Sequence, residues 1–196
     1  MSIIYFLGTS VNDYKAKVKQ TIKQMIQADM INCDICHKQM KTYGPYDRSI
    51  KDTGEDLPIY MAKCQSKQCN GSKHGHALIP DFILPHKHYS ADEIESVMMQ
   101  NAESISVSKT DTEASESTVR RWIGQVNERA RMAISVIRGI LIRLMLSISE
   151  LRIEGSTPFM ELSSLLEKHP ERPPRCGNIL GEANIHLSRE RGGVFI

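Results

Sequence analysis

The chain has 196 residues, a length that accommodates one domain or two small ones. Hydrophobic residues make up 40% and charged residues 24%, values that exclude a disordered or collagen-like chain. The net charge of +2 excludes a protein that coats DNA by charge alone, but the charge is unevenly spread. Residues 91–118 hold seven acidic residues and one basic residue, whereas the segments on either side are net positive.

The N-terminal segment, residues 1–30, predicts a strand and a helix. Its apolar start lacks the basic leader and the cleavage site of a secretory signal. The most apolar stretch, Met132–Ile148, contains Arg138 and Arg143, which argues against a transmembrane helix. Five cysteines, of which Cys176 stands apart, fit poorly with a fully paired secreted framework. We therefore expect a cytoplasmic protein with no membrane partner.

The other four cysteines form two closely spaced pairs in the second predicted unit, residues 31–88. Cys33 and Cys36 make a C-x2-C pair, and Cys64 and Cys69 make a C-x4-C pair. Each spacing lets one tight loop present two thiolates to the same ion, and two such loops supply the four soft ligands that Zn2+ prefers. We therefore predict that all four cysteines bind Zn2+.

The residues between the two pairs predict a β-hairpin. Extended segments at 46–51 and 57–63 flank a turn at 52–56, which is rich in Asp and Gly. Because a hairpin brings its two ends together, it would place the two cysteine pairs side by side. The metal would then supply much of the folding free energy of this small unit.

Three histidines are competing metal ligands. His37 directly follows Cys36, while His74 and His76 closely follow Cys69. A site of three cysteines and one histidine therefore stays open, as do a disulfide or no site at all. A shell of four thiolates leaves no position for a water molecule, so we expect a structural rather than a catalytic metal.

An extended connector and a capped helix are predicted after the hairpin. Residues 76–85 contain Pro80 and Pro85, which exclude a helix there. Ser90 is then the predicted N-cap of a helix, and Glu93 completes a capping box. A segment rich in Ser and Thr follows this helix and predicts a loop.

A second helix begins at Ser115 or Ser117, within a predicted helix-turn-helix-like unit at residues 89–155. Its apolar stripe, the expected buried face, is Val119, Trp122, Ile123 and Val126. Short polar and guanidinium side chains lie off this stripe near the helix start, where a recognition helix needs them. The residues predicted to contact DNA are Ser117, Thr118, Arg120, Arg121 and Gln125. The alternative is an ordinary surface helix with solvated arginines.

A further helix is predicted over residues 127–150. Its apolar residues alternate three and four apart, which predicts packing in the core or a homodimer through Ile134–Leu151. The last segment, residues 156–196, predicts a short helix followed by irregular structure. The predicted fold class is α+β, with a small zinc-ribbon β-hairpin domain followed by a mostly α-helical, helix-turn-helix-like domain.

The order of these motifs resembles an uncharacterised bacterial family of transposase-like zinc-ribbon proteins with a helix-turn-helix, associated with insertion elements. The resemblance covers about residues 30–126, and its most specific parts are the cysteine pairs and the HALIPDFILP segment. It implies that the four paired cysteines are metal ligands and that Thr118, Arg120 and Arg121 lie on the DNA-reading helix.

We therefore predict a zinc-stabilised protein that binds duplex DNA with the helix starting near Ser117, of the mobile-element or transcription-regulator type. We predict no enzymatic activity, because the sequence shows neither paired carboxylates with a His partner nor a catalytic zinc motif. The alternative is a zinc-ribbon module that binds other proteins, or a dimerising adaptor, without DNA binding.

Overall fold

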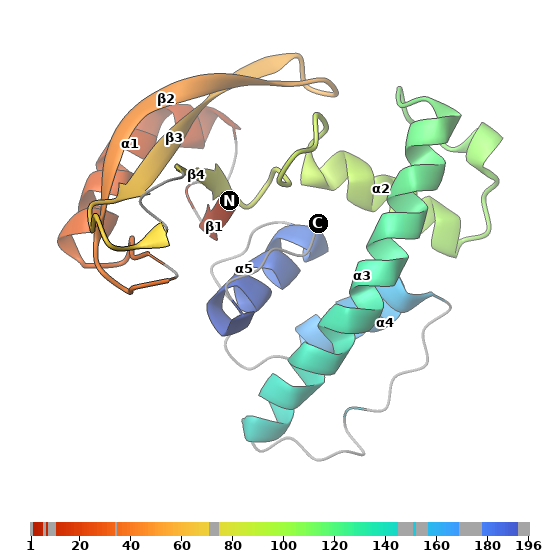
Figure 1. Cartoon of the computed structure of the whole chain (residues 1–196). Coiled ribbons are helices and arrows are strands. Elements are labelled where there is room, and N and C mark those ends of the chain that lie inside the picture. Colours follow the sequence, from red (N-terminus) through yellow and green to blue (C-terminus); the bar gives the residue numbers. More distant parts are fainter. Residues whose placement is uncertain are drawn as a thin grey trace.

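The computed structural model of the chain contains a sheet with one helix packed against it and a group of helices beside it (Figure 1). The structure describes residues 2–5, 7, 11–33, 35–70, 75–144, 151, 157–168 and 178–191. Buried hydrophobic side chains form two clusters, one in the sheet part and one among the helices. The α+β class agrees with the prediction.

The sheet has four strands in the order β1-β4-β3-β2. They are β1 (Ser2–Tyr5), β2 (Met40–Ile50), β3 (Glu55–Cys64) and β4 (His76–Pro80). β2, β3 and β4 are antiparallel, whereas β1 lies parallel to β4. The predicted extended connector is therefore partly wrong, because residues 76–80 form a strand that is paired on both sides. Pro80 ends this strand, so the residues before it keep the N–H groups that pairing needs.

The β2–β3 hairpin confirms the predicted hairpin but starts earlier than expected. Its first strand begins at Met40 and not at the predicted residue 46. Gly44 and Pro45, which are uncommon inside strands, do not end it. The pairing register shifts between Tyr43 and Tyr46, so the two breakers lie in a local irregularity of the ladder. Gly54 ends the turn with φ +65°, a conformation that a side chain disfavours.

The helix α1 (Val11–Gln27) packs against the sheet. Its buried side chains, three and four residues apart, are Tyr14, Val18, Ile22 and Met25. The Tyr14 hydroxyl donates a hydrogen bond of 2.7 Å to the carbonyl oxygen of Pro58 in β3. Its ring meets that of Phe82 edge to face, with centroids 5.8 Å apart. The helix α1 thus shares one core with the hairpin.

The helix α2 (Ala91–Ala102) begins at the predicted cap, Ser90. The Ser90 hydroxyl accepts a hydrogen bond of 3.1 Å from the Glu93 amide. The second half of the predicted capping box is wrong, because the Ser90 amide donates to Asp52 instead, over 2.8 Å. The Glu93 carboxylate accepts from the Thr112 hydroxyl. Asp52 comes from the hairpin turn, so the start of α2 is tied to the hairpin.

One continuous helix, α3 (Glu116–Arg143), replaces the two helices predicted after Ser115. No proline interrupts this stretch, and Gly124 lies in open space. The predicted continuation to Glu150 falls on residues 145–150, which lie outside the described residues. Among the residues that the structure describes, no helix is both long and apolar enough to cross a bilayer.

The connection between α2 and α3 spans residues 103–115 and contains a short 3-10 helix, η2 (Val107–Lys109). A helix-turn-helix joins its two helices by a turn of roughly 3–4 residues. The predicted helix-turn-helix character is therefore not confirmed, and any DNA contact by α3 has to be argued from its side chains.

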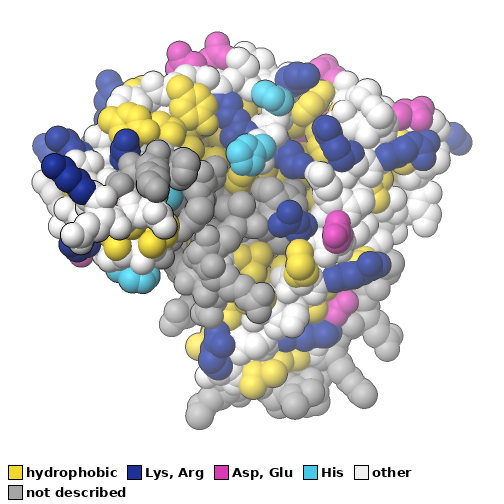
Figure 2. Space-filling model, in the orientation of Figure 1, with side chains coloured by type: hydrophobic (Ala, Val, Ile, Leu, Met, Phe, Trp, Pro, Cys, Tyr) yellow, Lys and Arg dark blue, Asp and Glu magenta, His cyan; other side chains and the backbone are white. Residues whose placement is uncertain are grey.

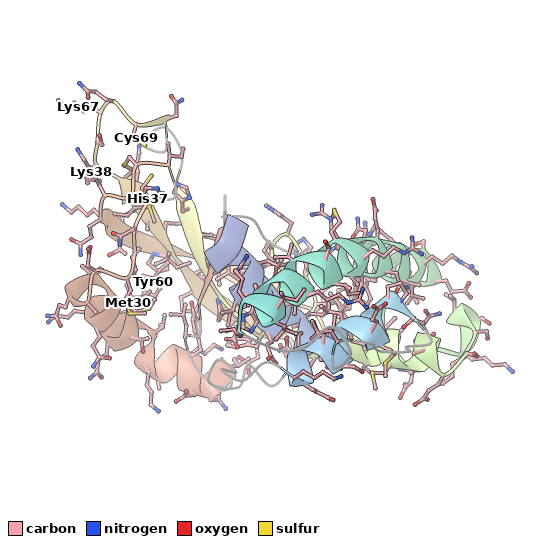
Figure 3. All side chains as sticks on the ribbon, turned by 90° about the horizontal axis from the view of Figure 1, so that it is seen from below. Met30, His37, Lys38, Tyr60, Lys67 and Cys69 are labelled. Carbon is pink, nitrogen blue, oxygen red and sulfur yellow. The ribbon has the colours of Figure 1, made fainter. Side chains whose placement is uncertain are left out.

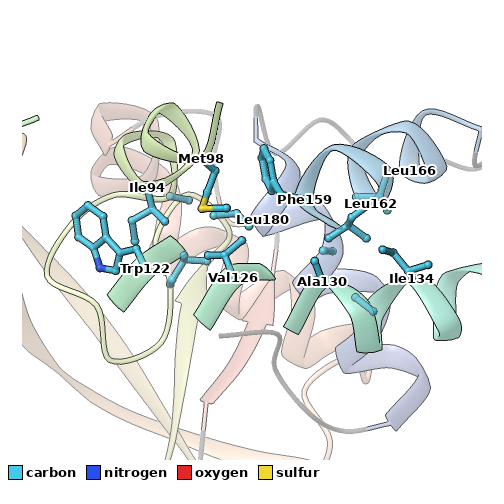
Figure 4. Close-up of a cluster of buried hydrophobic side chains, with 14 of the residues drawn as sticks. Ile94, Met98, Trp122, Val126, Ala130, Ile134, Phe159, Leu162, Leu166 and Leu180 are labelled. Carbon is cyan, nitrogen blue, oxygen red and sulfur yellow. The ribbon is translucent and has the colours of Figure 1, made fainter. Parts of the chain in front are cut away.

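The helical core lies where α3 crosses α2, α4 (Pro158–Glu167) and α5 (Ile179–Arg191). Figure 4 shows Trp122 and Val126 of α3 facing Ile94 and Met98 of α2, with Phe159 and Leu162 of α4 farther along. Of the predicted stripe, Val119, Trp122 and Val126 are buried and Ile123 is half-buried.

The predicted apolar seam of α3 also lies in this core. Ile134, Ile137 and Leu141 are buried, next to α4. A homodimer through this helix and its C-terminal end would therefore depend on the apolar side chains that stay exposed there, Met132, Ile142 and Leu144.

The helix α5 joins the two hydrophobic clusters. Ile185 belongs to the cluster of the sheet, whereas Leu180 and Ala183 belong to that of the helices. A side chain on Gly181 would come within 2.4 Å of the Asp81 carbonyl oxygen, so the close approach requires glycine. The Glu95 carboxylate of α2 accepts a hydrogen bond of 2.6 Å from the amide at Ile179, the first residue of α5.

Glu95 makes the stability of this contact depend on pH. Burial raises the pKa of the Glu95 carboxyl to about 7, although amides at the start of α5 partly offset the effect. Because its pKa is raised on folding, the protonated Glu95 carboxyl favours the folded state. This contribution to stability is complete below about pH 4.5, the ordinary pKa of a glutamate, and is lost as the pH rises to about 7. Glu95→Gln does not titrate, so its free energy of unfolding should not show this loss. We expect the free energy of unfolding of Glu95→Gln, relative to that of the wild type, to rise by about 1–2 kcal/mol when the pH is raised from 5 to 8.

Urea unfolding, followed by the fluorescence of the single Trp, measures this difference at both pH values. Protonation of the cysteines changes the stability of both proteins equally, so it cancels in the difference between their free energies of unfolding. An equal free-energy difference between the two proteins at pH 5 and pH 8 would contradict the prediction.

Candidate functional site

The four paired cysteines come together at one end of the hairpin. Cys33 and Cys36 lie in the loop between α1 and β2, Cys64 ends β3, and Cys69 follows in a short turn. Pairing of Met40 with Cys64 places the first loop beside the end of β3. The Cys33 carbonyl accepts from the His37 amide over 2.8 Å, and the Cys69 amide donates to Ser66 over 3.0 Å.

The sulfur positions fit a single tetrahedral ion. Cys33 Sγ lies 3.7 Å from Cys69 Sγ, and Cys36 Sγ lies 3.5 Å from Cys64 Sγ. All four sulfurs lie within 4.8 Å of one another. A disulfide needs about 2.05 Å, so these are free thiols. Zinc–sulfur bonds of about 2.3 Å imply tetrahedral edges of about 3.8 Å. The cluster could therefore hold a metal ion and is compatible with zinc.

Three of these cysteines are buried, and Cys36 is half-exposed. The Lys38 amide donates to the Cys36 sulfur and, together with the neighbouring thiols, lowers the pKa of Cys36 to about 7. The Ser66 amide lowers the pKa of Cys64, but burial and hydrogen bonds with the thiols of Cys36 and Cys33 outweigh it and raise that pKa. Since the thiolate is the form that binds metals, Cys36 is the member of this pair that is poised for coordination near neutral pH.

The histidine alternatives do not join the cluster within the described part of the chain, where the metal-ligating group consists of the four cysteines. His37 is exposed and His76 is buried in β4. His74 and Cys176 lie outside the described residues. The longer x4 spacing therefore does not displace Cys69, because the turn after β3 brings its sulfur to the other three.

The opposite end of the hairpin is clamped to the segment before α2. The buried Arg48 guanidinium donates to the carbonyl oxygen of Leu84 over 2.7 Å and also to that of Lys87. The Lys51 amide donates to the His88 carbonyl over 2.7 Å. His86 has φ 59°, a left-handed conformation that the surrounding contacts hold. The clamp therefore sets the position of Lys87.

Lys87 lies against one side of α3, among basic side chains. Its Nζ donates a hydrogen bond of 2.6 Å to Oε1 of Gln125. Burial lowers the pKa of Lys87, and the positive charges of Arg121 and Arg129 lower it further. Residues 121, 125 and 129 are four apart and so lie along one side of the helix. We call Lys87, Arg121, Gln125 and Arg129 the basic ridge.

Figure 2 shows Lys and Arg side chains along the face that contains α3, with His side chains near its upper end. The sequence analysis singled out neither Lys87 nor Arg129. The local sequence shows only that Lys87 is a basic residue shortly after a segment that contains two prolines. This pattern does not indicate that Lys87 contacts α3.

The predicted DNA-contacting residues divide between two sides of α3. Arg121 and Gln125 lie on the basic ridge. Arg120 lies about 100° farther round the helix and forms an ion pair of 3.4 Å with Glu116. Ser117 is exposed and Thr118 half-buried, and the hydroxyl of each lies within hydrogen-bond distance of the Ser115 hydroxyl, at 3.1 and 3.0 Å.

Comparison with known proteins identifies one related family. Residues 33–122 match the family described as a domain of unknown function (DUF6431), which covers a little under half of the chain. The match runs from the first clustered cysteine to Trp122, so it includes the cysteine cluster and Arg121 but not Gln125 or Arg129. No curated protein matches the chain, and no solved structure matches it.

Proposed function

We propose that the protein binds duplex DNA through the basic ridge and that zinc, held by the four cysteines, stabilises the fold that presents it. The observation that carries the proposal is the placement of Lys87 between Arg121 and Arg129. Three cations at this spacing repel one another, and Lys87 is partly desolvated. Phosphate oxygens relieve such repulsion, and neutralising them is the main source of affinity for DNA.

The chemistry of the ridge also suits base recognition. Glutamine, the side chain of Gln125, forms paired hydrogen bonds with adenine in the major groove, which admits an α-helix. Lysine contacts to phosphate fix the register of such a helix. The resemblance to transposase-like zinc-ribbon proteins favours a role with a mobile element, and transcription regulation is the alternative.

We assign the metal a structural role and propose no catalysis. When bound, zinc supplies a cross-link between the two cysteine loops. The four thiolates fill the tetrahedral shell, so the site offers no position for a reacting water. The cluster holds the ends of β2 and β3 together, while the Arg48 clamp fixes Lys87 at the other end.

The ridge is tested by removing two of its charges. We expect Arg121→Gln with Arg129→Gln to lower the slope of log affinity against log salt by about 1.8, because two phosphate contacts are lost. Affinity at 0.1 M salt should fall at least tenfold. Fluorescence anisotropy with the zinc-loaded protein and a labelled duplex measures both quantities.

The matched control is Arg120→Gln with Arg131→Gln, which removes the same charge from the other flank of α3. It should keep the wild-type slope. Equal losses in the two double variants would mean that the ridge is not the contact surface. Wild-type protein that binds no DNA would instead favour a protein partner.

A further inference from the structure

We infer that the metal-binding end of the hairpin is a second DNA-contacting surface, which binds the phosphate backbone independently of the ridge. This inference rests on the proposed function. The surface consists of four exposed lysines around the cysteine cluster, which we call the lysine tip: Lys38, Lys41, Lys63 and Lys67. Figure 3 shows Lys38 and Lys67 at the same end of the molecule as Cys69.

Two of these lysines face each other directly across the hairpin. Lys41 of β2 pairs with Lys63 of β3 in the antiparallel register, so their side chains lie on the same face of the ribbon. Like charges in this position destabilise the hairpin. An anion bound between them would remove that cost.

One acidic residue, Asp34, stands between Cys33 and Cys36 in the sequence, and the two segments that carry the four lysines add no other. Residues 35–46 and 60–70 include no Asp or Glu. The ion pairs of the described residues involve none of the four lysines. The positive charge of the tip is therefore available to an external anion.

Charge compensation of the metal cluster accounts for only part of this arrangement. Zinc with four thiolates carries a formal charge of about −2, which two lysines would balance. Four lysines leave an excess of positive charge. Lys41 and Lys63 are strand residues with exposed side chains, which favours a role toward solvent.

The shape of the tip suits a nucleic acid. Pairing with β4 stops at Ala62, and beyond it β2 and β3 continue as a two-stranded antiparallel ribbon, an element that the major groove of DNA admits. Two residues along the same face, Tyr43 pairs with Met61, and Tyr43 is 47% exposed. A partly exposed tyrosine beside a lysine pair can contact the sugar–phosphate backbone. A phosphate-rich groove is therefore the partner whose charge matches this surface.

The experiment compares Lys41→Gln/Lys63→Gln with a matched control, Lys19→Gln/Lys23→Gln, which removes two charges from exposed positions of α1. Anisotropy of a labelled 30-base-pair duplex is measured with the zinc-loaded full chain across a salt series. We expect the tip variant to lower the salt slope by about 1.8 and affinity at least tenfold at 0.1 M salt, with the control unchanged. Co2+ titration checks that the tip variant still binds metal as the wild type does.

An unchanged salt slope in the tip variant would overturn the inference, and weaker Co2+ binding in that case would assign the lysines to the metal cluster. If the wild type binds DNA and only the Arg121→Gln/Arg129→Gln variant lowers the slope of log affinity against log salt, the basic ridge contacts DNA and the lysine tip does not. If the wild type binds no duplex at all, the proposed function itself fails.

Discussion

Replacing Cys64 by Ser is expected to abolish tight metal binding and to unfold the sheet part of the protein. Cys64 ends β3, is buried, and lies 3.5 Å from Cys36. Loss of one thiolate opens the tetrahedral shell, and structural zinc sites contribute about 10–16 kcal/mol in small zinc-finger peptides. We expect most of that contribution to be lost here, together with the thiolate–cobalt absorption of the Co2+-loaded protein. Treatment of the wild type with a chelator should have the same effect on its circular dichroism.

The matched control is Cys176→Ser, since Cys176 lies outside the cluster in sequence and outside the described residues. It should bind one Co2+ with the wild-type spectrum and melt at the wild-type temperature. A Cys64→Ser protein that binds Co2+ and melts like the wild type would contradict the assignment of this cluster as a structural metal site.

Replacing Trp122 by Ala is expected to destabilise the helical part by about 3–5 kcal/mol, as large aromatic truncations in cores do. Trp122 is 1% exposed, packs among Ile94 and Met98, and meets the ring of Tyr89 edge to face at 4.9 Å. Trp122→Phe keeps a ring in place and should cost clearly less. Urea unfolding followed by circular dichroism compares the three proteins.

Trp122 belongs to the cluster of the helices and the metal-binding cysteines to the part of the chain around the sheet, so the Co2+ spectrum of Trp122→Ala should stay unchanged at low urea. A destabilisation of Trp122→Ala below 1 kcal/mol would show that this side chain does not hold the helices together.

The features predicted correctly from the sequence depend on local spacing. Two tight loops with two cysteines each predict a four-thiolate cluster, because the chemistry of zinc restricts the alternatives. The N-cap at Ser90 and the stripe that contains Trp122 follow from hydrogen bonding and from the helical period, which act within one or two turns.

The features that the sequence analysis missed depend on contacts between distant segments. Residues 76–80 form a strand because the preceding strand, β3, and also β1 from the start of the chain pair with it. The close approach at Gly181 and the carboxylate of Glu95 at the start of α5 join segments far apart in the chain. The contact of Lys87 with Gln125 likewise depends on the Arg48 clamp, which local patterns do not reveal.

The structure also changes which residues the DNA hypothesis depends on. The structure has one long helix where a recognition helix and a further helix were predicted, and Lys87 from another segment completes the basic side of that long helix. The hairpin connects this ridge to the cysteine cluster, because Arg48 and Asp52 at one end and Cys64 at the other belong to the same two strands and their turn. Loss of the metal should therefore weaken DNA binding even though no ridge residue is altered.

The most direct test of the central claim is the binding of zinc-loaded wild-type protein to duplex DNA across a salt series. Fluorescence anisotropy should show that log affinity falls linearly as log salt rises, by about 0.9 per phosphate contact, or about 2–3 for the ridge alone. A protein that leaves the anisotropy of the duplex unchanged even at low salt would contradict DNA binding.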